Sequence, residues 1–289
     1  MLKLFPSSSA AGRQRDKVVF LHCVKTGGTT FSRVLQRLYG DSYTFFDDDA
    51  ADVFAQRLAS FDCIEVHAIL RGDQLVWGTK NIMKESNRPL LTGTKVFVMF
   101  RDAVDCYISN FYQSKKFAKK LERTAAWSRS VPRTLDEYLE DPRFSNLQLK
   151  FLLGKDPDDG GALTDADLQD AKRLISTVGI KVGILERYSE SLHLFEHVTG
   201  CKIPLGIVVV RNKNRVPEAQ REIDETTRQR IRDMNVLDQG LYDFAKKVFG
   251  DQIAGCGPSP RYRYLSESSV FVRFMDLIGG LGARKGFRR

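Results

Sequence analysis

A lysine, two glycines and two threonines occur together in the segment HCVKTGGTT, directly after the apolar run VVFL. The run predicts a buried strand, and the apolar spacing after Thr29 predicts a helix. A turn between a strand and a helix directs backbone N–H groups and the positive end of the helix dipole at one point. The segment therefore predicts a phosphate site. Its expected contributors are a cation, two glycines that allow close approach and two hydroxyls: Lys25, Gly27, Gly28, Thr29 and Thr30.

The order of residues separates this loop from the common nucleotide-triphosphate loop. In G-x-x-x-x-G-K-[ST] the lysine follows the last glycine and a hydroxyl holds magnesium, whereas here Lys25 precedes Gly27. The alternative interpretation is a tight structural turn with an exposed lysine, because short motifs also occur by chance.

A second segment, VFVMFRDAVDCYISNFYQ, contains an arginine and a serine that could bind a phosphate. Arg101 ends a predicted strand, and Ser109 lies eight residues later, two turns into the next predicted helix. Such a pair can hold a second phosphate through charge-assisted hydrogen bonds. Ligands of open α/β sheets bind beyond the carboxyl ends of the strands, so we expect both segments to meet there. The alternative is a surface ion pair of Arg101 with Asp102 or Asp105, which would contribute little.

The remaining pattern predicts one α/β domain with a mostly parallel central sheet flanked by helices. We expect this domain at residues 17–250, after a flexible lead at 1–16 and before a basic and apolar extension at 251–289. Further strands are expected at 62–70, 95–102, 182–187 and 203–212. Further helices are expected at 103–123, at 163–177 with Thr164 as its N-cap, and at 220–250.

The composition of the chain indicates which kinds of partner and which cellular compartment to expect. The formal net charge of +9 and the pI of about 9.3 favour anionic partners such as nucleotides, sulfated glycans or an acidic membrane face. No zinc finger, RNP pattern or basic stripe interleaved with aromatic residues points to nucleic acid. The five cysteines are scattered without a C-x-x-C pair, which favours a reducing compartment. The apolar stretch at the N-terminus is too short for a signal peptide, so we expect a cytoplasmic protein.

Together the two segments resemble the sulfotransferases that use 3′-phosphoadenosine 5′-phosphosulfate, in particular the Golgi-type carbohydrate group that acts on heparan and chondroitin-like chains. That group carries H-x-P-K-T-G-G-T-[ST] and R-D-P-x-[DE]-x-x-x-S, which stand here as HCVKTGGTT and RDAVDCYIS. Val24 and Ala103 replace the two prolines, which removes no chemical group. The resemblance continues through NLQLKFLLG, ILERYSESLHLF and NVLDQGLYDFAKKVF, and so covers most of residues 17–250.

The resemblance implies a sulfotransferase fold related to the P-loop NTPases, and transfer of a sulfuryl group to a hydroxyl of a carbohydrate or glycolipid. Lys25 would stabilise charge on the phosphate oxygen as its bond to sulfur breaks, and Arg101 with Ser109 would hold the 3′-phosphate. No metal is expected, because a sulfuryl group carries less negative charge than a terminal phosphoryl group. A loop at 211–215 would close over the nucleotide. The donor contacts implied are Lys25, Thr26, Gly27, Gly28, Thr29, Thr30, Arg101 and Ser109.

His67 is the expected general base, because it follows the second predicted strand at the rim where the donor would lie. In the resembling family the proposed base is a histidine in a comparable G-H segment, where Val66 stands here. A pKa near neutrality would suit this role, and a hydrogen-bonded structural histidine is the alternative. Glu65 is the second candidate base, although strand alternation is expected to direct it to the other face. His22 is expected to support the phosphate loop.

Two remaining histidines, His193 and His197, are four residues apart on one predicted helix. This spacing can serve a shared metal, but no H-E-x-x-H pattern or third ligand accompanies it. A packed amphipathic helix is therefore expected, with no metal site.

Basic residues suggest the charge and place of the acceptor. One group follows Ser109 along the next helix: Lys115, Lys116, Lys119, Lys120, Arg123, Arg129 and Arg133. A second ends the chain after an apolar run: Arg284, Lys285, Arg288 and Arg289. Together they predict an anionic glycan or glycolipid acceptor and peripheral contact with the inner membrane face. The alternative is a solvated helix face and a packed C-terminal helix.

Two other functions remain open. One is a nucleotide-dependent kinase with an atypical phosphate loop, and the other is a non-catalytic protein that binds polyanions. The donor nucleotide discriminates among all three.

Overall fold

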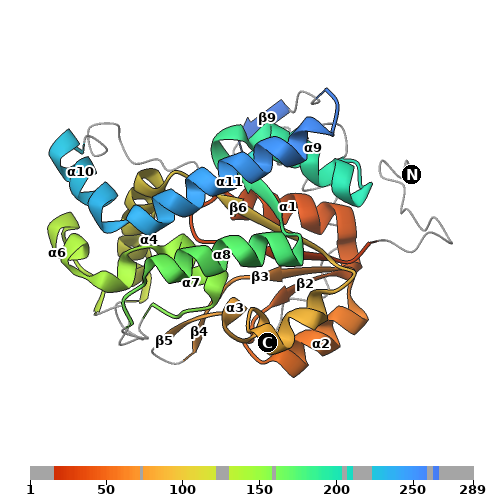
Figure 1. Ribbon diagram of the computed structural model, residues 1–289, viewed down its shortest axis with the longest axis horizontal. Helices are drawn as coiled ribbons and strands as arrows, with labels where there is room; N and C mark the ends of the chain where they lie inside the picture. Colours follow the sequence, from red (N-terminus) through yellow and green to blue (C-terminus); the bar gives the residue numbers. More distant parts are fainter. Residues whose placement is uncertain are drawn as a thin grey trace.

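The computed structural model describes residues 16–71, 74–121, 130–157, 161–203, 207–210, 223–258 and 263–266. Its centre is a five-stranded parallel sheet in the order β2-β3-β1-β6-β7 (Figure 1). The expected α/β class with a mostly parallel central sheet is therefore confirmed. The strands of this sheet are β1 (Val18–Leu21), β2 (Tyr43–Phe46), β3 (Cys63–Val66), β6 (Lys95–Phe100) and β7 (Lys181–Ile184).

The register of the sheet aligns the ends of its strands. Leu21, the last residue of β1, pairs with Val66 of β3 on one side and with Val98 of β6 on the other. All pairings are parallel, so the segments that follow β1, β3, β6 and β7 emerge at one edge, which we call the carboxyl edge. The phosphate loop, His67 and Arg101 all follow these strands directly.

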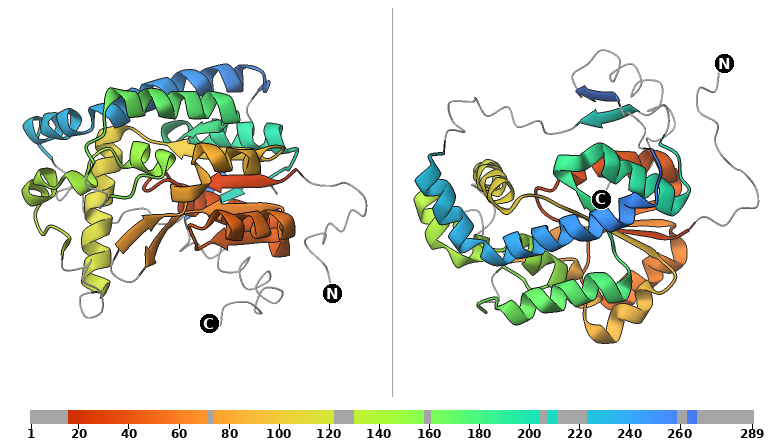
Figure 2. Two further views of the ribbon diagram at one scale, coloured as in Figure 1. Left: turned by 60° about the horizontal axis from the view of Figure 1, so that its bottom comes forward. Right: turned by 45° about the horizontal axis from the view of Figure 1, so that its top comes forward.

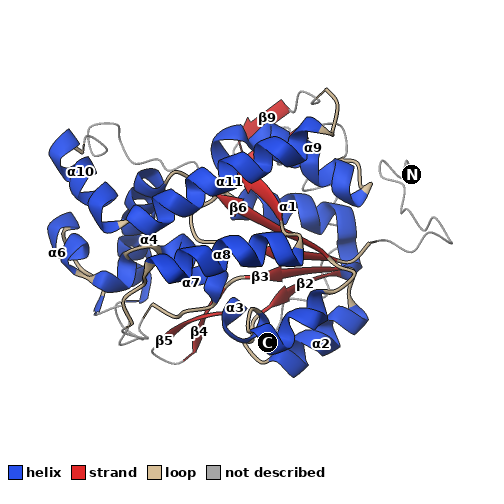
Figure 3. Cartoon of the chain, viewed as in Figure 1, coloured by secondary structure: helices blue, strands red, loops and turns tan. Residues whose placement is uncertain are grey.

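Helices cover both faces of the sheet (Figures 2 and 3). On one face lie α1 (Gly28–Tyr39) and α9 (Tyr188–Thr199). On the other lie α2 (Ala51–Ser60), α3 (Thr79–Ile82), α7 (Leu147–Leu153) and α8 (Asp165–Val178), and α11 (Val236–Ala254) runs along the edge strand β7. Beyond the carboxyl edge are α4 (Ala103–Leu121), α6 (Leu135–Glu140) and α10 (Glu225–Met234). Short 3-10 turns complete the description: η1 (Gly40–Ser42), η2 (Glu85–Leu91), η3 (Pro142–Phe144) and η4 (Leu185–Arg187).

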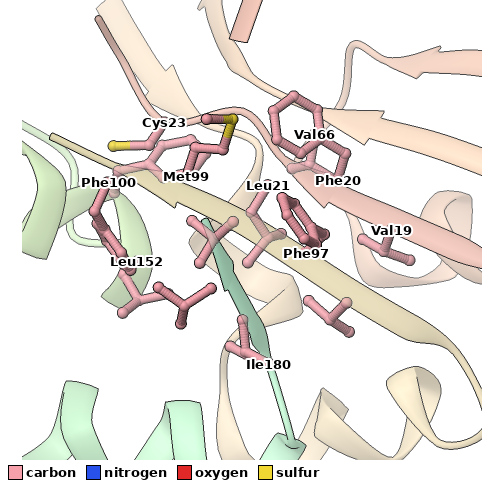
Figure 4. Close-up of a cluster of buried hydrophobic side chains, with 14 of the residues drawn as sticks. Val19, Phe20, Leu21, Cys23, Val66, Phe97, Met99, Phe100, Leu152 and Ile180 are labelled. Carbon is pink, nitrogen blue, oxygen red and sulfur yellow. The ribbon is translucent and has the colours of Figure 1, made fainter. Parts of the chain in front are cut away.

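Aromatic packing fixes α1 and α9 against the sheet. The ring of Phe31 on α1 lies 4.7 Å from that of Phe20 on β1 and 5.3 Å from that of Phe97 on β6. Phe195 of α9 completes the group, with its ring 5.0 Å from that of Phe31. Figure 4 shows neighbouring side chains of β1, β3 and β6 gathered with Leu152 of α7. Because these rings are buried, the start of α1 is held firmly against the sheet.

The strand expected at 62–70 is in fact two. β3 ends at Val66, and after His67 the chain forms β4 (Ala68–Arg71), which pairs antiparallel with β5 (Gln74–Trp77) outside the central sheet. The N–H of Gly78 donates to the carbonyl of His67 at 2.9 Å and closes this hairpin. The expectation of one strand was wrong because a continuous apolar run does not mark where a chain leaves a sheet.

Other boundaries also differ. The strand expected at 203–212 is β8 (Ile207–Val210), which pairs with β9 (Arg263–Ser266) in a separate two-stranded sheet, and β2 was not expected. Helix α11 continues past residue 250, so the expected boundary falls inside a helix. The loop at 211–215, Arg123, Arg129 and the four basic residues at the chain end lie outside the described residues. In the part of the chain that the structure describes, no helix combines the length and apolar character needed to cross a membrane.

Candidate functional site

The loop between β1 and α1 carries two residues in the left-handed backbone region. Gly27 has a φ of 84°, and a Cβ built on it would lie 2.5 Å from Cδ1 of Leu185, so this position requires glycine. Lys25 has a φ of 61°, a conformation that costs a non-glycine residue roughly 1–2 kcal/mol. Strain of this kind is concentrated at ligand sites. The geometry thus favours a binding loop over a plain turn.

The first turn of α1 follows this loop at the carboxyl edge. Because Gly28 and Thr29 begin the helix, their N–H groups have no acceptor within it and remain available to an anion. The hydroxyl of Thr26 donates to the carbonyl of Cys23 at 2.9 Å and is buried. Thr26 can therefore contribute only its backbone, while Thr29 is half-buried and Thr30 buried on the first turn.

Lys25 and Arg101 meet at this edge. Nη1 of Arg101 donates to the carbonyl of Lys25 at 3.4 Å, and Nζ of Lys25 donates to Oε1 of Gln113 on α4. Burial is the main cause that lowers the pKa of Lys25; Cys106 opposes it as the second-largest effect, and the positive charges of Arg101 and Lys116 lower the pKa further. Lys25 thus lies in the positive field of Arg101 and Lys116, an arrangement that a bound anion would stabilise.

One face of α4 turns toward the loop. Sγ of Cys106 donates to the carbonyl of Val24 at 3.4 Å, and Gln113 binds Lys25 as described. Ser109 lies between them at helical spacing and is buried, with 7% of its surface exposed. The structure therefore brings Lys25, Arg101 and Ser109 to the same place, as the two segments led us to expect.

The alternative ion pair of Arg101 is also present. Nη2 of Arg101 lies 3.8 Å from Oδ2 of Asp105, and both side chains are partly exposed, so the pair contributes little. A guanidinium has five N–H donors, so a long contact to one carboxylate leaves others for a ligand.

Glu65 is the centre of a buried network. Its carboxylate lies 2.5 Å from Nδ1 of His22 and accepts from Ser32 Oγ at 2.8 Å and from Tyr43 OH at 2.5 Å. Burial raises the pKa of Glu65, but these three partners outweigh it and the net pKa is lowered. The expectation that Glu65 points to the other face was wrong, since residues two apart on a strand share a face and both Glu65 and His67 contact His22. Glu65 is therefore ionised, and its carboxylate holds the side chains of His22, Ser32 and Tyr43 in place.

His22 packs directly under the loop. A Cβ built on Gly28 would lie 1.9 Å from Cδ2 of its ring. The hydroxyl of Ser32, whose single hydrogen the carboxylate of Glu65 and the carbonyl of Gly28 share, lies 2.8 Å from both oxygens. The network therefore ties the first turn of α1 to the sheet through His22, which agrees with its expected role in supporting the loop.

Gly28→Ala should destabilise the protein by about 1–3 kcal/mol, because the new methyl group overlaps the His22 ring and the ring is held by Glu65. Gly250→Ala on α11 is the matched control, since its Cβ would meet nothing within 4 Å. The control should be neutral or slightly stabilising. Chemical denaturation of both variants measures this. Equal stability of the two would contradict the packing of His22 on Gly28.

His67 is half-buried beside this network. Its ring lies 4.3 Å from that of His22, and its Nδ1 lies 2.9 Å from the carbonyl of Ala68. Burial, with the neighbouring His22 as a second cause, lowers the pKa of His67 to about 4. This pKa is lower than the value near neutrality that would suit a general base. At pH 7 the ring is neutral, with Nδ1–H donating to Ala68 and Nε2 carrying the lone pair.

His193 and His197 do not share a ligand position. His193 is buried with Nε2 3.0 Å from the carbonyl of Cys256, whereas His197 is exposed. Among the residues placed by the structure, no group of three or more His, Cys, Asp or Glu side chains can hold a metal.

Two glutamines of the site were not predicted from the sequence. Gln113 lies four residues after Ser109, so helical spacing alone could have placed it on the same face of α4. Gln148 hydrogen-bonds the backbone of Arg101 from 47 residues away, and no local pattern signals such a contact.

Comparison with known proteins adds no further assignment. No protein-family model matches the chain, and no curated protein matches it. The site itself therefore carries the functional argument.

Proposed function

We propose that the protein transfers a sulfuryl group from 3′-phosphoadenosine 5′-phosphosulfate to a hydroxyl of a carbohydrate or glycolipid, in a sulfotransferase fold of the P-loop type. The observation that carries the proposal is the meeting of Lys25 and Arg101, from two different strand ends, beside the start of α1. This donor has phosphates at two positions. Two separate cations next to one helix N-terminus fit it better than they fit a single phosphate.

In the proposed reaction the acceptor oxygen attacks sulfur, the bond between sulfur and the bridging phosphate oxygen breaks, and 3′,5′-bisphosphoadenosine leaves. Negative charge grows on the leaving phosphate, where Lys25 and the N–H groups of Gly28 and Thr29 stabilise it. The acceptor loses its proton to Nε2 of His67, the ring nitrogen opposite the one that faces Ala68. Negative charge on the bound donor raises the pKa of His67 and strengthens it as a base.

Isothermal calorimetry with three ligands tests the proposal. We expect 3′,5′-bisphosphoadenosine to bind more tightly than ATP with magnesium, and a short DNA duplex to bind weakly. Tightest binding of ATP with magnesium would favour the kinase, and tightest binding of the duplex would favour the polyanion-binding protein. Either result would reject the sulfotransferase proposal.

The acceptor charge and location are part of the proposal. Lys115, Lys116 and Lys119 are exposed on α4, beyond the turn that carries Gln113. An anionic glycan or glycolipid can lie along this basic helix with its reacting hydroxyl at His67. We propose a cytoplasmic location, with a glycolipid acceptor reached at the inner face of the membrane.

An exposed aromatic ring lies next to the proposed base. Phe45 of β2 is 41% exposed, and its ring centroid lies 5.9 Å from that of His67. A phenyl face at this place can support the apolar face of a sugar ring. Phe45→Ala should therefore raise the acceptor KM about tenfold, from a loss of roughly 1–1.5 kcal/mol, with donor KM unchanged.

The measurement is the initial rate with the best acceptor found in a screen with labelled donor. Phe61→Ala is the control, because Phe61 is a half-buried ring just before β3, at the opposite edge of the sheet. An unchanged acceptor KM in Phe45→Ala, or an equal rise in both variants, would contradict the assignment of Phe45.

A further inference from the structure

The backbone of Arg101 is held by one buried side-chain amide. The N–H of Arg101 donates to Oε1 of Gln148 at 2.9 Å, and Nε2 of Gln148 donates to the carbonyl of Arg101 at 2.9 Å. Gln148 is 1% exposed, so both bonds are shielded from water. The amide thus satisfies both backbone groups of the first residue after β6, where the sheet pairing has ended.

Gln148 is itself fixed by a buried carboxylate. Asp238 of α11 accepts from the N–H of Gln148 at 3.1 Å and from that of Leu149 at 2.8 Å. The N–H of Asp238 donates in turn to Oδ1 of Asn146 at 2.9 Å. These contacts lock the start of α7 to α11, so the amide of Gln148 has one position relative to the sheet.

A second tether holds the residue after Arg101. The N–H of Asp102 donates to Oε1 of Glu186 at 3.1 Å, and Oε2 of Glu186 accepts from Tyr242 OH at 2.9 Å. Tyr242 also belongs to α11. The strand end that carries Arg101 is therefore held by Gln148 of α7 and by Glu186 of η4, and α11 fixes both of these side chains.

We infer that Gln148 is the positioning residue for recognition of the 3′-phosphate. By holding both backbone groups of Arg101, it fixes the direction in which the guanidinium leaves the sheet edge. That direction places Nη1 at 3.4 Å from the carbonyl of Lys25, next to the phosphate loop. The inference rests on the proposed function, because it concerns the nucleotide that Arg101 selects. Gln148 and Asp238 lie in the segments NLQLKFLLG and NVLDQGLYDFAKKVF.

The chain supplies a matched control for this clamp. Gln252 of α11 makes the same pair of bonds to β7, accepting from the N–H of Val182 at 2.9 Å and donating to the carbonyl of Ile180 at 3.0 Å. These bonds lie at the start of β7, at the edge opposite the expected donor. Gln148→Leu and Gln252→Leu therefore remove the same two bonds, one set beside Arg101 and one set far from it.

Calorimetry with 3′,5′-bisphosphoadenosine and with 5′-AMP measures the effect on the full chain. In Gln148→Leu we expect affinity for the bisphosphate to fall about tenfold, with affinity for 5′-AMP unchanged. Gln252→Leu should bind both ligands as the wild type does. Should Gln148→Leu fail to fold, Gln148→Glu keeps the acceptor for the N–H of Arg101 and removes only the donor, and a smaller loss confined to the bisphosphate is expected.

The outcomes separate the two claims. Equal losses for both nucleotides in the Gln148 variants, or the same pattern in Gln252→Leu, overturn the positioning role. A wild-type protein that does not prefer the bisphosphate to 5′-AMP instead rejects the proposed function, whatever the variants do.

Discussion

Lys25→Ala is expected to lower turnover by ~10²–10³, the usual loss when one preorganised charge is removed from a reacting centre. Its affinity for 3′,5′-bisphosphoadenosine should stay within a few-fold of wild type, because the charge acts mainly on the leaving phosphate as the bond to sulfur breaks. Single-turnover rates with labelled donor, compared with calorimetric affinities, measure the two effects separately. Lys25→Arg keeps the positive charge and should recover part of the rate.

Arg101→Ala is the contrasting variant. The proposed contact of Arg101 is the 3′-phosphate, so this change should weaken bisphosphate binding more than it slows the bound donor's reaction. Lys116→Ala is the control for the general field, since Lys116 is exposed and acts on Lys25 only through its charge. If Arg101→Ala bound the bisphosphate as well as wild type, the assignment of the 3′-phosphate would be wrong. If Lys25→Ala kept full turnover, the role of the loop lysine would be wrong.

Local patterns predicted the parts of the site that lie on single elements. The run before Lys25, the helix after Gly27 and the helix that carries Ser109 all depend on spacing within a few residues. They appear as β1, α1 and α4. Their meeting at one edge followed from the parallel sheet alone, because parallel strands place their carboxyl ends together.

Contacts between distant segments could not be read in this way. Nothing near Glu65 shows that His22, Ser32 and Tyr43 converge on its carboxylate, since each lies more than 20 residues away along the chain. The pKa of His67 depends on the same packing, because burial and His22 lower it. The chain leaves the central sheet after Val66 because the next segment, β4, pairs with β5. The order of apolar residues in the run does not indicate this pairing.

His67→Gln is expected to lose most turnover and to bind 3′,5′-bisphosphoadenosine normally, because His67 would act on the acceptor proton and not on the nucleotide. The pH profile adds a second readout. With a pKa of about 4 the ring of the free protein is neutral from about pH 5 upward, so the His67-dependent part of kcat/KM for the donor should be flat between pH 6 and 8. Unchanged turnover in His67→Gln would reject His67 as the general base. His22, which is held by Glu65, would then be the next histidine to test.

The stability of the same variant tests the pKa without any substrate. The pKa of His67 falls from an ordinary value of 6.5 to about 4 on folding. Between pH 4 and 6.5 the unfolded chain therefore binds a proton at His67, whereas the native chain does not. The free energy of unfolding contributed by this site is therefore lost as the pH falls from 6.5 toward 4, by at most roughly 3.5 kcal/mol at about 1.4 kcal/mol per pKa unit. Asp238 acts with the opposite sign, because burial raises its pKa to about 6 and its contribution is lost as the pH rises through that value.

Only the difference between wild type and variant isolates His67, since Asp238 is common to both. We expect chemical denaturation to show that wild type loses more stability than His67→Gln when the pH is lowered from 7.5 to 5. A glutamine cannot take up a proton at either pH, so its curve reports every other titrating group. Parallel pH dependence in the two proteins would mean that His67 has the same pKa folded and unfolded, and that the ring is not shielded by His22 and the hairpin after β3.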